Sequence, residues 1–271
     1  MNVGAVRLRV SDLDRSLAFY TEALGLDLLS RDATAASLGA GGRALVHLRA
    51  LAGAGPRPRG STGLYHFAVL MPDRRALGHA LARLVAARWP LQGVADHGVS
   101  EALYLGDPDG LGIELYRDRP RSAWPMRDGV LAMTTDPLDA QALLDEAAAG
   151  EIPARADPAT RMGHIHLQVR DLGEAERFWS GAVGFDVMQR WVPGALFVSS
   201  GGYHHHLGLN TWGTAGAPPA PETAVGMDWF ELLAEGDAPD RMAASGVALE
   251  ARDGGWLARD PAGNGVLIGS A

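Results

Sequence analysis

The chain repeats itself, and this repeat limits the folds that it can adopt more than any other feature. The segment VSDLDRSLAFYTEALGLD, which begins at Val10, aligns without a gap with VRDLGEAERFWSGAVGFD, which begins at Val169. A second matching pair consists of GDPDGLGIELY, starting at Gly106, and RDPAGNGVLIG, starting at Arg259. Internal repeats mark duplicated structural units, and overlooking them misassigns the whole fold. The two halves of the chain are therefore expected to open and close in the same way.

Each half divides again into two smaller units with the same order of elements. VRLRV alternates like a strand, and SDLDRSLAFYTEAL follows with an N-cap residue and helix-period apolar positions that end at Gly25. Short strands come next, and the turn DPDG has the chemistry of a tight hairpin. The pattern predicts an α+β fold of four βαβββ modules. It divides the chain into an N-terminal domain of two modules at 1–120, a linker with a helix at 121–160 and a C-terminal domain of two modules at 161–271.

Composition argues against several classes of function. The 271 residues carry a formal net charge of -8 and no block of Lys or Arg, which argues against a nucleic-acid partner. There is no cysteine, so disulfides, thiolate catalysis and Cys-ligated zinc are excluded. The N-terminus lacks the pattern of a signal peptide, and no apolar stretch approaches the length of a membrane span. We expect a cytoplasmic protein without membrane contact.

Three residues stand at matching points of the repeated strand patterns: His66 in LYHFAVLMPD, Glu114 in GIELYRD and His164 in GHIHLQVRD. Two imidazoles and one carboxylate form a facial triad that leaves open positions on a metal. A lone strand histidine is more often an ordinary core or surface residue, and glutamate is common on exposed strand faces. Glu114, however, stands between apolar neighbours, where an unpaired buried carboxylate is costly and a metal would remove that cost. The sequence therefore predicts a metal site at these three residues.

This four-module pattern resembles the vicinal oxygen chelate superfamily, which contains glyoxalases, bleomycin resistance proteins and extradiol dioxygenases. Within it, the chain looks most like the catechol 2,3-dioxygenase-like proteins. The resemblance covers almost the whole chain and is carried by LYHFAVLMPD, ADHGVSEALYLGDPDGLGIELYRDRP, GHIHLQVRDL and GGYHHHLGLNTW. It implies two paired-sheet domains whose modules form cups around a metal. It also implies Fe(II) as the cofactor, with Mn(II) or another divalent metal as the alternative.

The superfamily places its ligands on the first and last strands of the modules, so each module can be compared. The first module has Ala5 at the position that corresponds to His164. The fourth has Asp228 and Leu267 at the positions that correspond to the other two ligands. We therefore expect the metal site to join the second and third modules across the domain boundary, with the first and fourth forming a metal-free mate. In familiar two-domain extradiol enzymes the ligands lie wholly in the C-terminal domain, so this arrangement departs from them.

Ring cleavage also needs a histidine that takes a proton and later supports attack and O–O cleavage. The resemblance places this residue in the run His204–His206, on a strand of the third module. Because neighbouring strand residues point to opposite faces, the three side chains cannot share one face. The alignment favours His205, with His206 as the alternative. His97 in ADHGVS is a second candidate.

Three further residues are candidates for the substrate pocket. Tyr104 in ALYLGD resembles the family's tyrosine that hydrogen-bonds the bound substrate oxygen, although its pattern is also that of a core aromatic. Asn210 and Trp212 in GLNTW are expected to line the pocket, although a tryptophan is more often a packing residue.

The predicted function is a metal-dependent extradiol dioxygenase that acts with O2 on catechol or a substituted catechol, a small aromatic diol. The first alternative is a glyoxalase-type isomerase, lyase or transferase. Glyoxalases usually have four protein ligands including two carboxylates, and only one carboxylate stands at a ligand position here. The second alternative is a non-catalytic small-molecule-binding protein, which would lack the ligand set. Whether the chain forms a homo-oligomer stays open.

Overall fold

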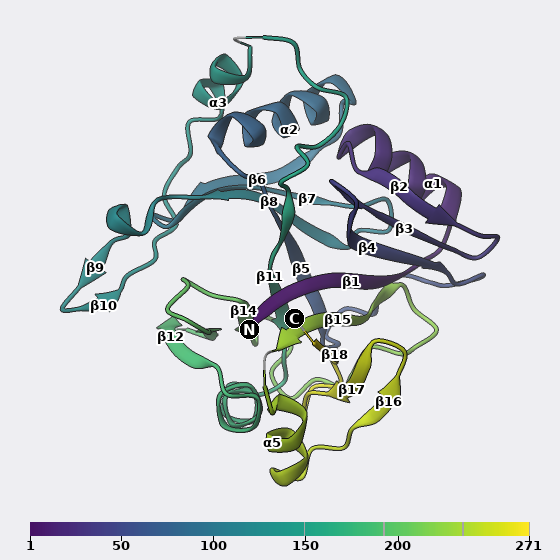
Figure 1. The fold of residues 1–271 in the computed structure, drawn as a ribbon, viewed down its shortest axis with the longest axis vertical. Helices are drawn as coiled ribbons and strands as arrows, with labels where there is room; N and C mark the ends of the chain where they lie inside the picture. The colour runs from purple at the N-terminus through teal and green to yellow at the C-terminus, as the bar shows by residue number, and fades with distance from the viewer. Residues whose placement is uncertain (149, 192, 235, 271) are drawn as a thin grey trace.

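The computed structural model describes residues 1–148, 150–191, 193–234 and 236–270, and these fold into four successive units of a strand, a helix and three strands (Figure 1). The first unit holds β1 (Asn2–Val10), α1 (Leu13–Ala18), β2 (Asp27–Arg31), β3 (Ala35–Ala40) and β4 (Arg43–Ala50). The second holds β5 (Gly63–Leu70), α2 (Arg74–Ala86), β6 (Leu91–Asp96), β7 (Ser100–Gly106) and β8 (Gly112–Asp118). The third holds β11 (Arg161–Gln168), α4 (Leu172–Glu176), β12 (Asp186–Trp191), β13 (Ala195–Ser199) and β14 (Leu207–Asn210). The fourth holds β15 (Gly226–Ala234), α5 (Ala238–Ala244), β16 (Glu250–Arg252), β17 (Gly255–Arg259) and β18 (Gly265–Ser270).

The segment between the second and third units has its own small elements. They are the 3₁₀ turn η2 (Arg121–Ala123), the hairpin of β9 (Met126–Arg127) and β10 (Val130–Leu131), and α3 (Ala140–Ala147). The last of these is the helix expected in the linker, and it packs beside α2 (Figure 1). No helix in the described parts of the chain has the length and apolar character needed to cross a membrane.

The repeat is visible in how the helices begin and end. In α1 and α4 the side chain of an aspartate, Asp12 or Asp171, accepts a hydrogen bond from a backbone N–H of the first turn. Both helices continue into π turns, η1 (Phe19–Ala23) and η3 (Arg177–Val183). Gly184 then adopts a left-handed backbone at φ +97°, which a residue without Cβ accepts readily. The same local chemistry therefore builds the same element twice.

The long strands of the described residues form two eight-stranded sheets. Their strand orders are β16-β17-β18-β15-β1-β4-β3-β2 and β12-β13-β14-β11-β5-β8-β7-β6. At the centre of each sheet two opening strands pair antiparallel, β1 with β15 and β5 with β11. The first unit therefore shares a sheet with the fourth, and the second with the third, as a metal site across the two halves requires. Each sheet thus takes strands from both halves of the chain. The division into separate domains at 1–120 and 161–271 stays a prediction.

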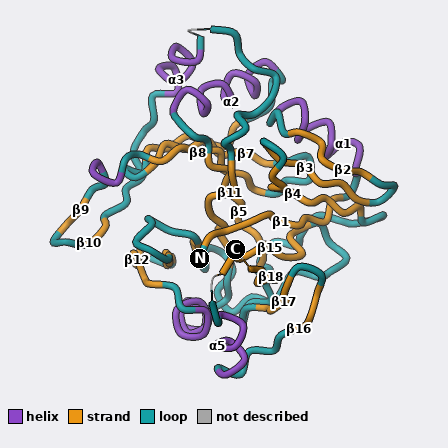
Figure 2. Tube along the Cα trace, in the orientation of Figure 1, coloured by secondary structure: helices purple, strands orange, loops and turns teal. Residues whose placement is uncertain are grey.

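Alternation along the central strands separates a packing face from a functional face. On β5, Phe67 and Val69 enter the main apolar core together with Leu77 of α2. His66 and Ala68 alternate with them and point to the opposite face of the sheet, which we call the cup face. Figure 2 shows the helices at the periphery, with the strands between them. The helices thus cover the packing faces, and the cup face is left for polar chemistry.

Candidate metal centre

Three adjacent strands at the centre of the second sheet carry the predicted ligands. Strands β11, β5 and β8 lie side by side and bring His164, His66 and Glu114 together. Nε2 of His66 lies 3.0 Å from Oε2 of Glu114, and Nε2 of His164 lies 3.1 Å from the same oxygen. Donor atoms of all three residues lie within 4.8 Å of one another. The two halves of the sequence therefore meet at one cluster of metal-ligating groups on the cup face.

The charge states of this cluster suit a metal. Glu114 is only 2% exposed. Burial raises the pKa of Glu114, but His164 and His66 more than offset this effect and hold the pKa well below its usual value. Burial lowers the pKa of His164 despite the opposing effect of Glu114. An ionised carboxylate beside a neutral imidazole is the form in which these side chains bind metal ions.

Two ring nitrogens in the cluster are buried without a well-aligned hydrogen bond to any described residue: Nε2 of His66, which lies 3.0 Å from Oε2 of Glu114 but at an unfavourable angle, and Nδ1 of His164. Buried polar atoms nearly always have a partner, so each exception needs an explanation. A metal bound by Nε2 of His66 would explain the first. Two imidazole nitrogens and one carboxylate oxygen are also a donor set that suits divalent transition metals. The residues present therefore fit the implied cofactor.

A cavity of about 550 Å³ lies next to the cluster, and His66 and Glu114 form part of its wall. This volume is in the range of sites that bind small molecules. Most of the remaining wall is apolar or aromatic, contributed by Tyr65, Val99, Met133, Trp191, Phe197 and Trp212. The cavity therefore combines a metal-ligating patch with a lining that would pack against a flat aromatic ring.

Tyr104 and His97 form a hydrogen-bonded pair in the wall of this cavity. Tyr104 lies on β7 directly opposite Glu114 of β8. Nδ1 of His97 lies 2.7 Å from the carbonyl oxygen of Thr134, and Nε2 lies 2.7 Å from the hydroxyl of Tyr104. A carbonyl only accepts, so a neutral His97 carries its hydrogen on Nδ1 and accepts from Tyr104 at Nε2. Burial, followed by the charge of Glu114, raises the pKa of Tyr104 well above its usual value, so this phenol is a neutral donor.

The histidine run lies outside the strand expected for it, because β14 begins only at Leu207. Strand alternation therefore does not govern these residues: Nδ1 of His204 and Nδ1 of His205 lie 2.8 Å apart, while His206 lines a different cavity, so the three side chains do not share one face, as expected. The ring of His205 lies 4.1 Å from that of His164, centroid to centroid, and it lines the metal-side cavity. Burial lowers the pKa of His205 well below its usual value. Its neutral ring thus lies against a candidate ligand.

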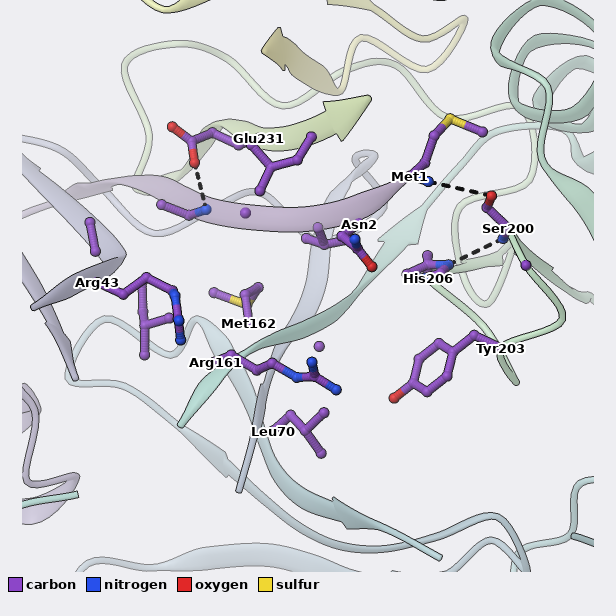
Figure 3. A pocket seen from close by; sticks show the side chains of 18 of the residues that line it. Met1, Asn2, Arg43, Leu70, Arg161, Met162, Ser200, Tyr203, His206 and Glu231 are labelled. Carbon is purple, nitrogen blue, oxygen red and sulfur yellow. Dashed lines mark hydrogen bonds between the residues drawn. The ribbon is translucent and has the colours of Figure 1, made fainter. Parts of the chain in front are cut away.

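His206, the alternative to His205, faces elsewhere. Its Nδ1 accepts a hydrogen bond from the backbone N–H of Ser200 at 3.2 Å and lies 3.0 Å from Oγ of Ser199. It lines a second cavity of about 630 Å³, together with Tyr203 and the N-terminal residues (Figure 3). The structure therefore places His206 away from the candidate ligands and His205 next to them.

A further histidine, His166, was not among the residues predicted from the sequence. It is 5% exposed, lines the metal-side cavity, and its ring lies 4.9 Å from that of His66. The signal was present, because alternation in GHIHL places His164 and His166 on the same strand face. Of the two residues proposed from GLNTW, Trp212 lines the cavity. Asn210 is fully buried, and its Nδ2 donates to Nε2 of His166 at 3.0 Å, so it orients that ring.

The matching positions of the other sheet carry different residues. The expectation that Asp228 matches His66 is wrong: Arg7 pairs with Trp229 as its counterpart His166 pairs with His66, so Trp229 holds that position. Asp228, the preceding residue, accepts hydrogen bonds from Arg9 at 2.5 Å and from Arg49 at 3.1 Å. Burial raises the pKa of Asp228, but the two guanidinium groups hold it below its usual value. With Ala5 and Leu267 at the other matching positions, this sheet lacks the ligand set of its partner.

Comparison with known proteins identifies the family to which the chain is similar. Residues 2–115 match the model of the Glyoxalase/Bleomycin resistance protein/Dioxygenase superfamily. The chain is 43% identical over 269 residues to the catechol-2,3-dioxygenase of Bacillus subtilis (strain 168), with 96% of this chain and 94% of that protein covered.

Solved structures support only the fold of this chain, because their sequences are too distant to support a function. A protein of Bacillus subtilis subsp. subtilis strain 168 with a provisional dioxygenase name superimposes with a TM-score of 0.68 at 16% identity, covering 100% of this chain and 85% of that one. Glyoxalase I from Zea mays superimposes with a TM-score of 0.60 at 18% identity, covering 99% of this chain and 92% of that one.

Proposed function

Because this chain belongs to the glyoxalase/bleomycin resistance protein/dioxygenase superfamily, we propose that it is an extradiol dioxygenase that cleaves catechol or a substituted catechol with O2. One observation carries the proposal: His66, Glu114 and His164 place donor atoms within 4.8 Å of one another beside an aromatic-walled cavity. The 43% identical relative, named a catechol-2,3-dioxygenase, supports the same class of reaction.

The cofactor in this proposal is a divalent metal held by His66, Glu114 and His164, with Fe(II) first and Mn(II) as the alternative. When bound, the metal supplies positions for both catechol oxygens and for O2, and it passes electrons between them. Three protein ligands leave those positions open. The single negative charge of Glu114 is balanced by the divalent ion.

The remaining side chains of the cavity have separate roles in this proposal. His205 accepts a proton from a catechol hydroxyl and returns it later in the reaction, because its neutral ring lines the cavity next to His164. The phenol of Tyr104 donates a hydrogen bond toward the substrate oxygen or, at rest, to Nε2 of His97. The apolar walls orient the ring and exclude bulk water, which strengthens the electrostatic interactions inside.

A glyoxalase-type isomerase is the main competitor, because glyoxalase I from Zea mays shares the fold. The candidate cluster contains one carboxylate, whereas the resemblance implies two for glyoxalases. This difference favours the dioxygenase. The two activities are distinguished by assay.

The test is anaerobic reconstitution of the full-length protein with Fe(II), followed by catechol and air. We expect O2 uptake together with a yellow ring-opened semialdehyde. Glu114→Gln should abolish this O2 uptake, and its matched control is Glu101→Gln, since Glu101 is a buried glutamate on β7 bound by Arg74 and Arg117 rather than by histidines. Iron bound in the wild type without O2 uptake on any of several catechols would contradict the proposal. Turnover of a thiol adduct of a 2-oxoaldehyde instead would establish the competitor.

A further inference from the structure

Asp118, the last residue of β8, lies four residues beyond the candidate ligand Glu114 and has a hydrogen-bonded side chain of its own. Its carboxylate lies 2.9 Å from Nε2 of His204. It also accepts from the hydroxyl of Tyr203, at 2.9 and 3.0 Å to its two oxygens. The side chain of Asp118 is 26% exposed, whereas that of His204 is fully buried. The strand that carries Glu114 therefore ends in a carboxylate that holds a buried imidazole.

The positions of the hydrogens follow from counting donors and acceptors. A carboxylate only accepts, so Nε2 of His204 carries a hydrogen, and a neutral ring then has a lone pair on Nδ1. Nδ1 of His204 lies 2.8 Å from Nδ1 of His205, so with a neutral His204 ring the donor is Nδ1 of His205. His205 consequently carries its hydrogen on Nδ1, and its Nε2 has a free lone pair.

Two tyrosines complete the support of Asp118. The single hydrogen of the Tyr203 hydroxyl goes to the carboxylate, so the Tyr203 oxygen accepts from Tyr116, 2.8 Å away. Tyr203 lies in the wall of the second cavity (Figure 3), and Tyr116 is fully buried. A series of hydrogen bonds therefore runs from Tyr116 through Tyr203, Asp118 and His204 to His205, and each of its bonds has an assigned donor and acceptor. Such fully satisfied buried networks fix side-chain geometry.

We propose that Asp118 and His204 are positioning residues that hold His205 in the tautomer with hydrogen on Nδ1, so that Nε2 is the acceptor available to the metal-side cavity. The inference rests on the proposed function and deepens it, because it assigns the atom that receives the proton of the catechol hydroxyl. His204 acts only through His205, since His205 lines that cavity. The supporting contacts join β8 to the segment before β14, 86 residues apart in sequence.

The first test reads the tautomer directly and needs no turnover. Full-length, metal-free protein with ¹⁵N-labelled histidine is studied by long-range ¹H–¹⁵N correlation, and His205 is assigned from the signals lost in His205→Gln. We expect Nδ1 of His205 and Nε2 of His204 to be the protonated nitrogens in the wild type. In Asp118→Asn and His204→Phe, the His205 signals should shift toward a mixture of tautomers. A protonated Nε2 in wild-type His205, or an unchanged pattern in both variants, would overturn the inference.

The second test uses the reconstituted enzyme. Asp118→Asn should lower kcat by about 10- to 100-fold while KM for catechol and the metal content stay near wild type, because general-base catalysis contributes about 10²- to 10⁴-fold and the variant misplaces the base without removing it. Asp118→Glu should recover part of the loss. The matched control is Asp228→Asn, a part-buried aspartate of the other sheet, which should leave both kcat and the His205 tautomer unchanged. Wild-type kcat in both Asp118→Asn and His204→Phe would overturn the inference.

The two proposals fail in different ways. A wild-type protein that cleaves no catechol contradicts the proposed function, whereas the tautomer of His205 in the metal-free protein is decided without that activity. If Asp118→Asn does not fold, His204→Phe carries both tests, because it keeps an aromatic ring in the buried position.

Discussion

A Cβ placed on Gly163 would lie 1.8 Å from the phenol oxygen of Tyr116, so β11 passes this ring only because residue 163 has no side chain. The register between β11 and β5 shifts here, between Met162 and His164. A shift of this kind re-aims neighbouring side chains, and bulges are common next to active sites. Gly163 therefore links the geometry of the candidate ligand His164 to the position of Tyr116.

Gly163→Ala should accordingly destabilise the protein by about 1–3 kcal/mol, as overpacking of a dense interior does. The free energy of unfolding is measured by urea denaturation. The matched control is Gly181→Ala, since a Cβ there meets nothing within 4 Å. An equal effect of the two substitutions would contradict the argument.

Glu114→Gln should weaken binding of Mn(II) or Fe(II) by at least about 100-fold, because loss of a ligand costs more than loss of a supporting contact. The change keeps the volume of the side chain and removes its charge. Metal content after dialysis and titration calorimetry measure the loss. Glu101→Gln should lose stability but keep the metal, and normal metal content in Glu114→Gln would rule out this site.

Tyr104→Phe should keep the metal and lower kcat by about 100-fold, as removal of one oriented donor from an active site does. The substitution removes the hydroxyl that His97 accepts from, and it leaves the ring in the wall of the cavity. Steady-state O2 uptake measures the change. Tyr65→Phe, which alters another tyrosine of the same cavity, should have a much smaller effect.

The buried ring of His206 should make stability depend on pH. Burial, its main cause, lowers the pKa of His206 from 6.5 to about 3. Between these values the unfolded chain binds a proton that the folded protein does not, so stability falls as the pH falls. Each unit of difference corresponds to about 1.4 kcal/mol, which gives roughly 3 kcal/mol between pH 6.5 and about pH 4.

The contribution of His206 is isolated by comparing wild type with His206→Gln by urea denaturation at a series of pH values. The glutamine can still accept from the backbone N–H of Ser200 and does not titrate in this range. The difference in unfolding free energy should change steadily below pH 6.5. A constant difference over the whole series would show that the folded protein binds this proton as readily as the unfolded chain.

Much of the fold was predictable because the repeat carries local chemistry. Asp12 and Asp171 recur at equivalent helix starts, and Gly25 and Gly184 at equivalent helix ends, so the modules could be delimited. The pairing of modules is not a local property. It followed from the ligand positions, because a triad divided between two modules can bind metal only if those modules share a sheet.

The arrangement around His205 could not be predicted from the sequence. Alternation between faces holds only within a strand, and the histidine run precedes β14. The partner that orients His204 is Asp118, 86 residues earlier, and no local pattern marks that contact. His166 was overlooked for a different reason: its spacing from His164 was readable, but three ligands already satisfied the expected pattern.

The order of strands also bears on how the protein is made. The contact between Glu114 and His164 joins residues 50 apart, whereas the bond from the backbone of Ala5 to Glu231 joins residues 226 apart. Closing the longer loop costs about 1.3 kcal/mol more in chain entropy. During synthesis, β1 cannot pair with β15 until that strand is made, which happens only after all three candidate ligands have left the ribosome. The sheet that contains β1 and β15, rather than the one that carries the candidate metal centre, is therefore the part that a nascent chain exposes to misassembly.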